Sequence, residues 1–402
     1  MIRFRTTRLR AAALATAALA LGSAVGPALG LLSAPLEGEP TARTLPPVPA
    51  DGTMGFVISR LVLPVIHDKA ACPEGPALTL RQSFVESLSP QERARLLLKE
   101  NEPELTKRWQ AQIFGPNGTN ICSNPDMFER PLIRTLKSPN AWGFDLDGDG
   151  GKGGDSDEGC AQEDFTTPTG EPGIDNQEYR VLGCMPGYRG EDGLKSEYET
   201  GTRQFFLSGE WTQVILVRGI DSLEHDPSVE VIYANTPDRP AVDSSSRMLP
   251  GSSFTISDKP PRRRNVLKGR IDNGVLTTEP ADIRLAQTWG QGGARDIRGN
   301  RTTYDLRKGR LRLELQNDGS ALGMLGGYRP VFELIQSPAI GGAGSGITAG
   351  IDCAGQLRTL LHFADGIKDP KTGKCSGVSA AYRIEAIPAF VNDVPAARTA
   401  AR

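Results

Sequence analysis

The second half of the chain, from Phe205 onward, alternates short apolar runs with clusters of turn residues. WTQVILVRGI and SVEVIYAN flank DSLEHDP, VLKGRI and VLTT flank DNG, and LRLELQ and ALGML flank NDGS. Runs of this length bounded by Gly, Pro, Asn and Asp are typical of β-strands, and Asn273-Gly274 suits a tight hairpin turn. The spacing predicts an antiparallel β-sandwich or a jelly-roll-like fold for this C-terminal region.

Helical patterns lie in the first half of the chain. The clearest begins at Ser89, which can cap a helix, with Pro90 in the first turn and Glu92 completing a capping box. A second short helix is predicted from Pro103, and a third covers NQEYRVLGC (176–184). The expected fold is therefore mainly β with an N-terminal α/loop lobe, which is an α+β class.

Changes in composition divide the chain into five expected parts. They are a signal peptide (1–30), a Pro-rich linker (31–54), a disulfide-containing α/loop lobe with an acidic calcium-type loop (55–200), a β-rich domain (201–392) and a disordered tail (393–402).

The N-terminus has the order of charged, apolar and small residues that is typical of an export signal. Four arginines precede an apolar run from Ala11 to Leu21, and small residues follow it. The alternative is a membrane anchor, but the apolar run is too short to cross a bilayer. We expect a periplasmic or secreted protein with no membrane span after cleavage.

Charge is distributed unevenly along the chain, although the formal net charge is only −2. Residues 141–178 are strongly acidic, whereas residues 259–270 and 295–312 are strongly basic. The basic stretches could bind an acidic polymer, but a solvated face is the simpler interpretation. Export and net acidity argue against nucleic acid as a partner.

An even number of cysteines in an exported chain predicts disulfides. Proximity along the sequence suggests pairing Cys72 with Cys122, Cys160 with Cys184, and Cys353 with Cys375. The alternatives are a zinc site or haem attachment. No pair has the Cys-x-x-Cys spacing that these require, so structural bridges are favoured.

The stretch GFDLDGDGGKGGDSDEGC carries the best candidate site. Asp145, Asp147 and Asp149 alternate and precede Gly150, as in the first half of a calcium loop. The position of the closing glutamate is occupied by Ser156, which excludes an ordinary EF-hand. The sequence predicts a calcium-binding loop whose shell Asp155, Asp157 or Glu158 could complete.

Two other interpretations of the acidic loop remain open. The loop could be solvated without an ion, or its Asp-x-Asp could belong to a phosphatase of the haloacid-dehalogenase type, which it matches poorly. Asp164, Asp175 and Asn176 could donate further oxygens to the loop. Asp365 and Asp369 form a second acidic segment, for which a disulfide-held turn is favoured over an ion site.

No catalytic signature is present in the sequence. The three histidines have no metal-ligand spacing, and His225 is expected at an exposed hairpin tip. Gly341–Gly350 lacks the pattern of a phosphate-binding loop, and no nucleophile elbow occurs. The protein is therefore more readily interpreted as a binding or structural module than as an enzyme.

Five motifs together resemble an uncharacterised family of exported proteobacterial proteins. They are WGFDLDGDG, GIDNQEYRVLGC, KGRIDNGVLTTEPADIRL, GMLGGYRP and FADGIKDPKTGKC. The resemblance covers most of the mature chain and implies a single architecture in which the acidic loop and GIDNQ form one unit. It implies no activity and no catalytic residues.

These observations lead to one expected function and one alternative. The first is a calcium-stabilised binding or structural module of the periplasm or cell envelope, whose partner could be a glycan or an envelope component. The alternative is a secreted hydrolase that uses acidic residues on a glycan or an ester.

Overall fold

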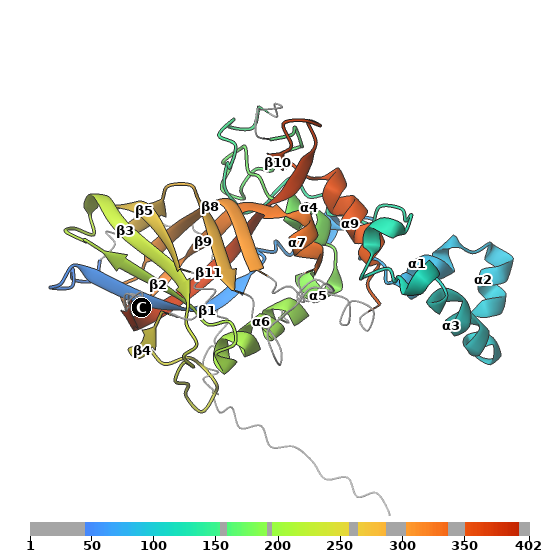
Figure 1. Cartoon of the computed structure of the whole chain (residues 1–402), viewed down its shortest axis with the longest axis horizontal. Helices are drawn as coiled ribbons and strands as arrows, with labels where there is room; N and C mark the ends of the chain where they lie inside the picture. The colour runs from blue at the N-terminus through green and yellow to red at the C-terminus, as the bar shows by residue number, and fades with distance from the viewer. Residues whose placement is uncertain are drawn as a thin grey trace, which may run out of the picture. The chain divides into compact units, whose positions relative to one another are not determined.

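A single antiparallel sheet closes on itself to form the centre of the protein (Figure 1). The computed structural model describes residues 45–152, 159–190, 195–256, 264–286, 303–336 and 350–393. The expected signal peptide, most of the expected linker and nearly all of the expected tail lie outside these residues.

The barrel has eight strands, and each pairs with its neighbour in chain order. They are β1 (Thr53–Val62), β2 (Gln213–Arg218), β3 (His225–Asn235), β5 (Arg264–Asp272), β6 (Val275–Thr278), β8 (Thr303–Leu315), β9 (Ala321–Pro330) and β11 (Cys375–Asn392). Three extra strands flank the barrel: β4 (Ser252–Thr255) runs parallel to β11, β7 (Ala281–Ala286) pairs with β8, and β10 (Gly366–Lys368) pairs with β11.

The prediction of a mainly β fold is confirmed, but the predicted sandwich or jelly roll is wrong. The pairing of β1 with β11, which sets Phe56 opposite Pro388 and Val62 opposite Arg383, closes the sheet. Hairpin signals are the same in a sandwich and in an up-and-down barrel, so they do not reveal this closure. Strand β1 belongs to the barrel although it lies mostly in the range expected for the lobe.

The predicted hairpin turns are present. Asp272 pairs with Val275, and the two residues between them have positive φ, 49° for Asn273 and 73° for Gly274. Such a two-residue turn matches the twist of the flanking strands and favours Asn-Gly.

Strand residues alternate between the barrel interior and the outside. On β5, Leu267 and Ile271 are buried while Lys268 and Arg270 are exposed, as the period of two requires. The interior is filled by a large apolar cluster that includes several aromatic side chains. The largest of these are Phe56, Trp211, Tyr233, Tyr304 and Tyr382.

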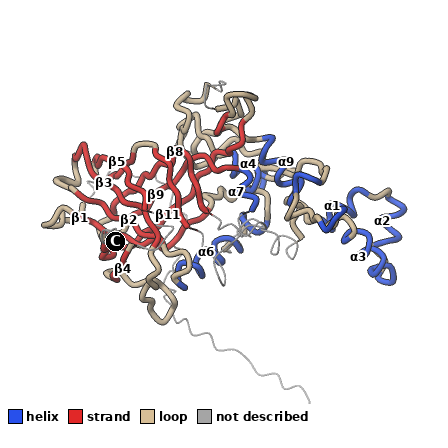
Figure 2. Tube along the Cα trace, in the orientation of Figure 1, coloured by secondary structure: helices blue, strands red, loops and turns tan. Residues whose placement is uncertain are grey.

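Helices occupy the connections outside the barrel. Figure 2 shows α1, α2 and α3 standing apart from the strands. In the described part of the chain the α-helices are α1 (Leu80–Ser87), α2 (Pro90–Leu96), α3 (Glu102–Gln110), α4 (Gln177–Leu182), α5 (Pro186–Arg189), α6 (Glu197–Ser208), α7 (Val331–Gln336) and α9 (Cys353–His362). Among the described residues, no helix combines the length and apolar character that crossing a membrane requires.

The three predicted helices are confirmed as α2, α3 and α4. Ser89 caps α2, because its hydroxyl oxygen accepts the backbone N–H of Glu92 at 3.2 Å. The Glu92 side chain does not complete the capping box; it pairs instead with Arg95, at 3.0 Å, and with Arg108.

All six cysteines form disulfides, as predicted, but all three predicted pairings are wrong. Cys72 bonds to Cys184, Cys122 to Cys353, and Cys160 to Cys375. Nearness in sequence is a poor guide here because the fold brings Cys353 of α9 and Cys375 of β11 against segments from the first half of the chain. Two of the three bridges consequently span more than 200 residues (231 and 215).

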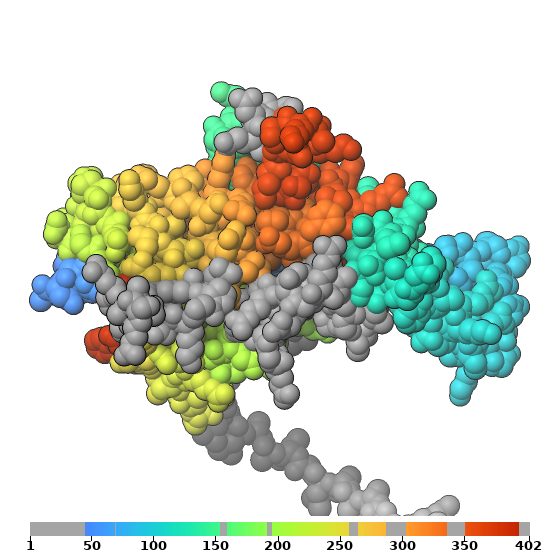
Figure 3. All heavy atoms as spheres, in the orientation of Figure 1, coloured from blue at the N-terminus to red at the C-terminus, as the bar shows by residue number. Residues whose placement is uncertain are grey.

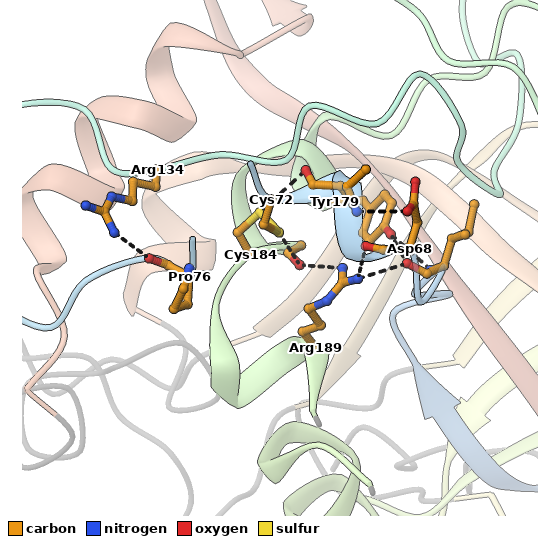
Figure 4. The surroundings of a disulfide bond; sticks show 11 residues. Asp68, Cys72, Pro76, Arg134, Tyr179, Cys184 and Arg189 are labelled. Atoms are coloured by element: carbon orange, nitrogen blue, oxygen red, sulfur yellow. Dashed lines mark hydrogen bonds between the residues drawn. A yellow bond between two sulfur atoms is a disulfide. The ribbon is translucent and has the colours of Figure 1, made fainter. Parts of the chain in front are cut away.

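The Cys72–Cys184 bridge ties the chain leaving β1 to the end of α4 (Figure 4). Polar contacts surround it: Arg189 donates to the carbonyl oxygen of Asp68 at 2.8 Å, and the Tyr179 hydroxyl accepts the backbone N–H of Ile66 at 3.0 Å. Covalent and polar contacts together fix the position of α4, which directly follows the acidic region.

A buried ion pair connects α4 to the barrel. Arg329 of β9 donates to the Tyr382 hydroxyl at 2.9 Å and to the Glu178 carboxylate at 3.4 Å, and the Tyr382 hydroxyl also donates to Glu178. The guanidinium lies over the ring of Tyr304, 4.5 Å from its centroid. Because Glu178 and Arg329 are both buried, each depends on the other to compensate its charge.

This dependence yields a stability prediction. Arg329→Met should lower the free energy of unfolding by about 3–5 kcal/mol, because it leaves the Glu178 carboxylate buried without an opposite charge. Urea unfolding followed by tryptophan fluorescence measures the change. Adding Glu178→Gln to Arg329→Met should recover part of the loss. The matched control is Arg312→Met, at an exposed position of β8; an equal effect of the two arginine substitutions would contradict the assignment.

Candidate metal centre

The three alternating aspartates gather around one point. One oxygen from each of Asp145, Asp147 and Asp149 lies within 4.8 Å of the others. Backbone N–H groups hold this arrangement: Gly148 donates to Asp145 at 2.6 Å, Gly150 to the other oxygen of Asp145 at 3.1 Å, and Asp149 to Asp147 at 3.0 Å. Both glycines have positive φ, which the tight turn requires. The sequence therefore folds locally into an aspartate-lined loop.

Two further aspartates from the following segment reach the loop. Asp175 accepts the backbone N–H of Leu146 at 2.7 Å and that of Asp147 at 3.3 Å, and its own N–H donates to the carbonyl oxygen of Phe144 at 2.9 Å. Asp164 interacts with the carboxylates of Asp147, Asp149 and Asp175. Asp164 and Asp175 thus lie beside the loop, and their donation of oxygens to an ion stays a prediction.

A sixth aspartate, Asp365, comes from the segment before β10. One of its carboxylate oxygens accepts the backbone N–H of Ser379 at 2.7 Å. The other, Oδ2, is buried and has no hydrogen-bond partner among the described residues. Its charge interacts with those of Asp147 and Asp175. Asp365 thus adds to the cluster a buried carboxylate that interacts with Ser379 and has one oxygen without a partner in the described part of the chain.

The third disulfide brings these segments together. Cys160 bonds to Cys375, and its backbone N–H donates to the carbonyl oxygen of Asp365 at 2.9 Å. Gly159 and Gly366 form a β-bridge beside it. In Figure 3 the red β10 segment lies near the green atoms of the acidic region.

The acidic loop packs against the outer face of the barrel, on strands β8 and β9. The ring of Phe144 packs so closely on Gly326 of β9 that any side chain at this glycine would collide with it. Arg310 of β8 donates to the carbonyl oxygens of Asp145 at 2.7 Å and Leu146 at 2.8 Å. Arg310 therefore positions the backbone of the loop, and these contacts do not reach the carboxylates.

Burial and mutual repulsion shift the titration of the cluster. Burial, with the charges of Asp365 and Asp147, raises the pKa of Asp175 to about 8. Burial also raises the pKa of Asp365 to about 7, and burial with the charges of Asp149 and Asp147 raises that of Asp164 to about 6. The cluster is thus unfavourable when all its members are ionised, and a bound cation would relieve that cost.

Other residues named from the sequence fall elsewhere. Asp155, Asp157 and Glu158 lie outside the described residues. Asn176 caps α4, since its side-chain oxygen accepts the backbone N–H of Tyr179 at 3.2 Å. His225 lies at the start of β3, 3.9 Å from Asp272 and largely exposed. Asp369 closes the turn before Cys375, accepting backbone N–H groups of that turn, as the preferred interpretation predicts.

Sequence reasoning missed Asp365 as part of the first site. Asp365 and Asp369 share one short segment, so the sequence pattern groups Asp365 with Asp369 and not with the first loop. The only signal that could have linked Asp365 to Asp145 is the pairing of Cys160 with Cys375, and proximity in the sequence favoured other partners for both cysteines.

Comparison with known proteins adds no assignment to this geometry. No family model matches the chain, and no curated protein and no solved structure matches it. The resemblance to exported proteobacterial proteins therefore stays a prediction.

Proposed function

We propose that the acidic cluster binds calcium and that the protein is a calcium-stabilised binding or structural module exported to an oxidising compartment. The observation that carries this proposal is the convergence of Asp145, Asp147 and Asp149, together with the charge of the buried Asp365, whose Oδ2 has no hydrogen-bond partner among the described residues. A buried acceptor without a partner is costly, and a cation is the partner that this concentration of negative charge favours.

The donor chemistry supports calcium over a transition metal. Every candidate ligand is a carboxylate oxygen, and Asp145, Asp147 and Asp149 repeat the spacing of a calcium loop. Calcium accepts six to eight oxygens in flexible geometry, so carboxylates from several segments suit it better than the strict octahedron of magnesium. Zinc and copper prefer sulfur or imidazole ligands.

The proposed ion stabilises the junction of three segments. Asp145, Asp147 and Asp149 come from the loop, Asp175 from the start of α4, and Asp365 from the approach to β10. These segments are already joined by the Cys160–Cys375 bridge. An ion between them supports the layer that covers β9 and β11, which gives the site a structural role.

The disulfides support the proposed location. Three bridges are compatible with an oxidising compartment such as the periplasm or the extracellular space. A glycan or an envelope component stays the expected partner from the sequence, and the calcium site does not depend on which partner binds.

The alternative of a secreted hydrolase is less favoured. Its strongest support is the raised pKa of Asp175 and Asp365, since a general acid needs a pKa near the working pH. A catalytic carboxyl must also reach its substrate, whereas Asp175 is 5% and Asp365 6% exposed. Burial of both carboxyls favours a bound ion over a polymeric substrate.

Calcium should raise the melting temperature of the purified protein. For a dissociation constant of roughly 0.1–1 mM, about 10 mM calcium stabilises the folded state by about 1.4–2.7 kcal/mol, because only the folded chain assembles the site. Differential scanning calorimetry with calcium and with chelator measures this difference. Magnesium at equal concentration should have a smaller effect.

Substitutions identify the site. Asp145→Asn combined with Asp147→Asn should abolish the calcium-dependent rise, while Asp369→Asn, in the nearby turn, should keep it. If the unsubstituted protein melts at the same temperature in calcium and in chelator, the proposal is wrong.

The raised pKa values also predict a pH dependence. In the ion-free protein, Asp164, Asp175 and Asp365 hold protons at pH values where the unfolded chain, with aspartate near 3.8, has lost them. Their contribution to stability is full below about pH 4 and is lost as the pH rises through about 6 to 8. The melting temperature in chelator should therefore fall between pH 5 and pH 8, and calcium should reduce that fall.

Asp175→Asn tests the cause of this dependence. Asparagine can still accept the backbone N–H of Leu146 but carries no charge. The ion-free variant at pH 8 should be at least as stable as the unsubstituted protein, and its response to calcium should be lost. A large destabilisation in chelator at pH 8 would show that repulsion at Asp175 is not the governing factor.

A further inference from the structure

A pocket separate from the acidic cluster opens beside the C-terminal half of α9. Its volume is about 520 Å³, within the range of small-molecule sites. The lining residues come from α9, from the turn before β11 and from the segment that runs along α9. They are Leu132, Arg358, Leu361, His362, Ala364, Lys374 and Cys375.

The lining combines basic and apolar side chains. Arg358, His362 and Lys374 bring a guanidinium, an imidazole and an amine to the lining, and none of the seven lining residues is acidic. None of these three forms an ion pair with a carboxylate in the described part of the chain. Leu132 and Leu361 add apolar surface that is 44% and 37% exposed to solvent. An occupant would therefore meet positive charge and apolar surface in the same pocket.

Both walls are fixed by the fold. Arg358, Leu361 and His362 follow the three- and four-residue spacing that places side chains on one face of a helix. Arg358 donates to the carbonyl oxygen of Arg130 at 2.8 Å, and the backbone N–H of Ile133 donates to the Thr359 hydroxyl at 3.0 Å, which holds Leu132 against α9. On the other side, the Cys160–Cys375 bridge anchors the turn that carries Lys374.

We propose that this pocket binds a small organic anion, a carboxylate or phosphate attached to an apolar body. The acidic group pairs with Arg358 and Lys374, and the apolar body covers Leu132 and Leu361. Arginine and lysine both bind such oxyanions through charge-assisted hydrogen bonds.

The lining distinguishes this ligand from two other classes. A metal cation is disfavoured because no carboxylate lines the pocket and Arg358 and Lys374 carry positive charge. An inorganic anion would leave both leucines exposed to water, so a ligand with an apolar portion gains more. The proposal does not depend on calcium, because none of the six clustered aspartates lines the pocket.

Isothermal titration calorimetry of the full protein with matched probes tests the proposal. Octanoate and octyl phosphate carry both an acidic group and an apolar body, whereas octanol lacks the charge and acetate lacks the body. At least one of the two amphipathic anions should bind with one site per chain, at least about tenfold more tightly than octanol or acetate. Equal binding of octanol, or no saturable binding of either anion, would overturn it.

Substitutions assign the binding to this pocket. Arg358→Gln combined with Lys374→Gln should weaken the bound anion at least about tenfold, while Lys371→Gln, an exposed lysine of the same turn outside the lining, should not. Because Arg358→Gln also removes a structural hydrogen bond, Lys374→Gln alone serves as the second variant, and circular dichroism checks its fold. Unchanged affinity in the folded Lys374→Gln variant would contradict the role of Lys374.

Anion binding should persist in chelator and in Asp145→Asn combined with Asp147→Asn. A failed calcium test therefore leaves the anion proposal unaffected.

Discussion

The pairing of β1 with β11 is the constraint on which the rest of the structure depends. It closes the sheet, so that the inward side chains of all eight strands meet in one core. It also determines where the other segments can go. Once β11 lies between β1 and β9, the chain that follows β1 is brought against the last strand and against α9. The Cys160–Cys375 disulfide joins this last strand to a segment from the first half of the chain.

Closure also explains which features could be predicted from the sequence. The Asn273-Gly274 hairpin, the cap at Ser89 and the helix after Asn176 are specified by residues a few positions apart, and all three are present. The choice between sandwich and barrel depends on a contact between the two ends of the folded chain, and hairpin signals contain no information on it. The predicted disulfide pairings are wrong for a similar reason, because the observed bridges join segments far apart in the sequence.

The acidic site shows the same division between local and distant contacts. Asp145, Asp147 and Asp149 converge because the loop's own backbone N–H groups hold them, and the sequence spacing predicts this. Asp175 lies beside the loop because it forms a β-bridge with Phe144, within the same region of the chain. Asp365 is held beside the loop by the β-bridge of its neighbour Gly366 to Gly159 and by the Cys160–Cys375 disulfide. No local sequence pattern indicates these two contacts. The placement of Asp365, whose Oδ2 lacks a partner among the described residues, is thus the part of the cluster that no local sequence pattern predicts.

The two proposed sites share one structural element, the segment from Asp365 to Cys375. The charge of its first residue, Asp365, interacts with the acidic cluster, and its last residues, Lys374 and Cys375, line the basic pocket. Only β10 and the turn closed by Asp369 separate them. The opposite charges lie in different surroundings, because Asp365 is buried against Ser379 while Lys374 is exposed. The Cys160–Cys375 bridge anchors both ends of this arrangement, since Cys160 also holds the backbone of Asp365. Reduction of this single bridge would therefore affect both proposed sites, whereas reduction of Cys122–Cys353 would affect only the proposed pocket, through the α9 helix that carries Arg358.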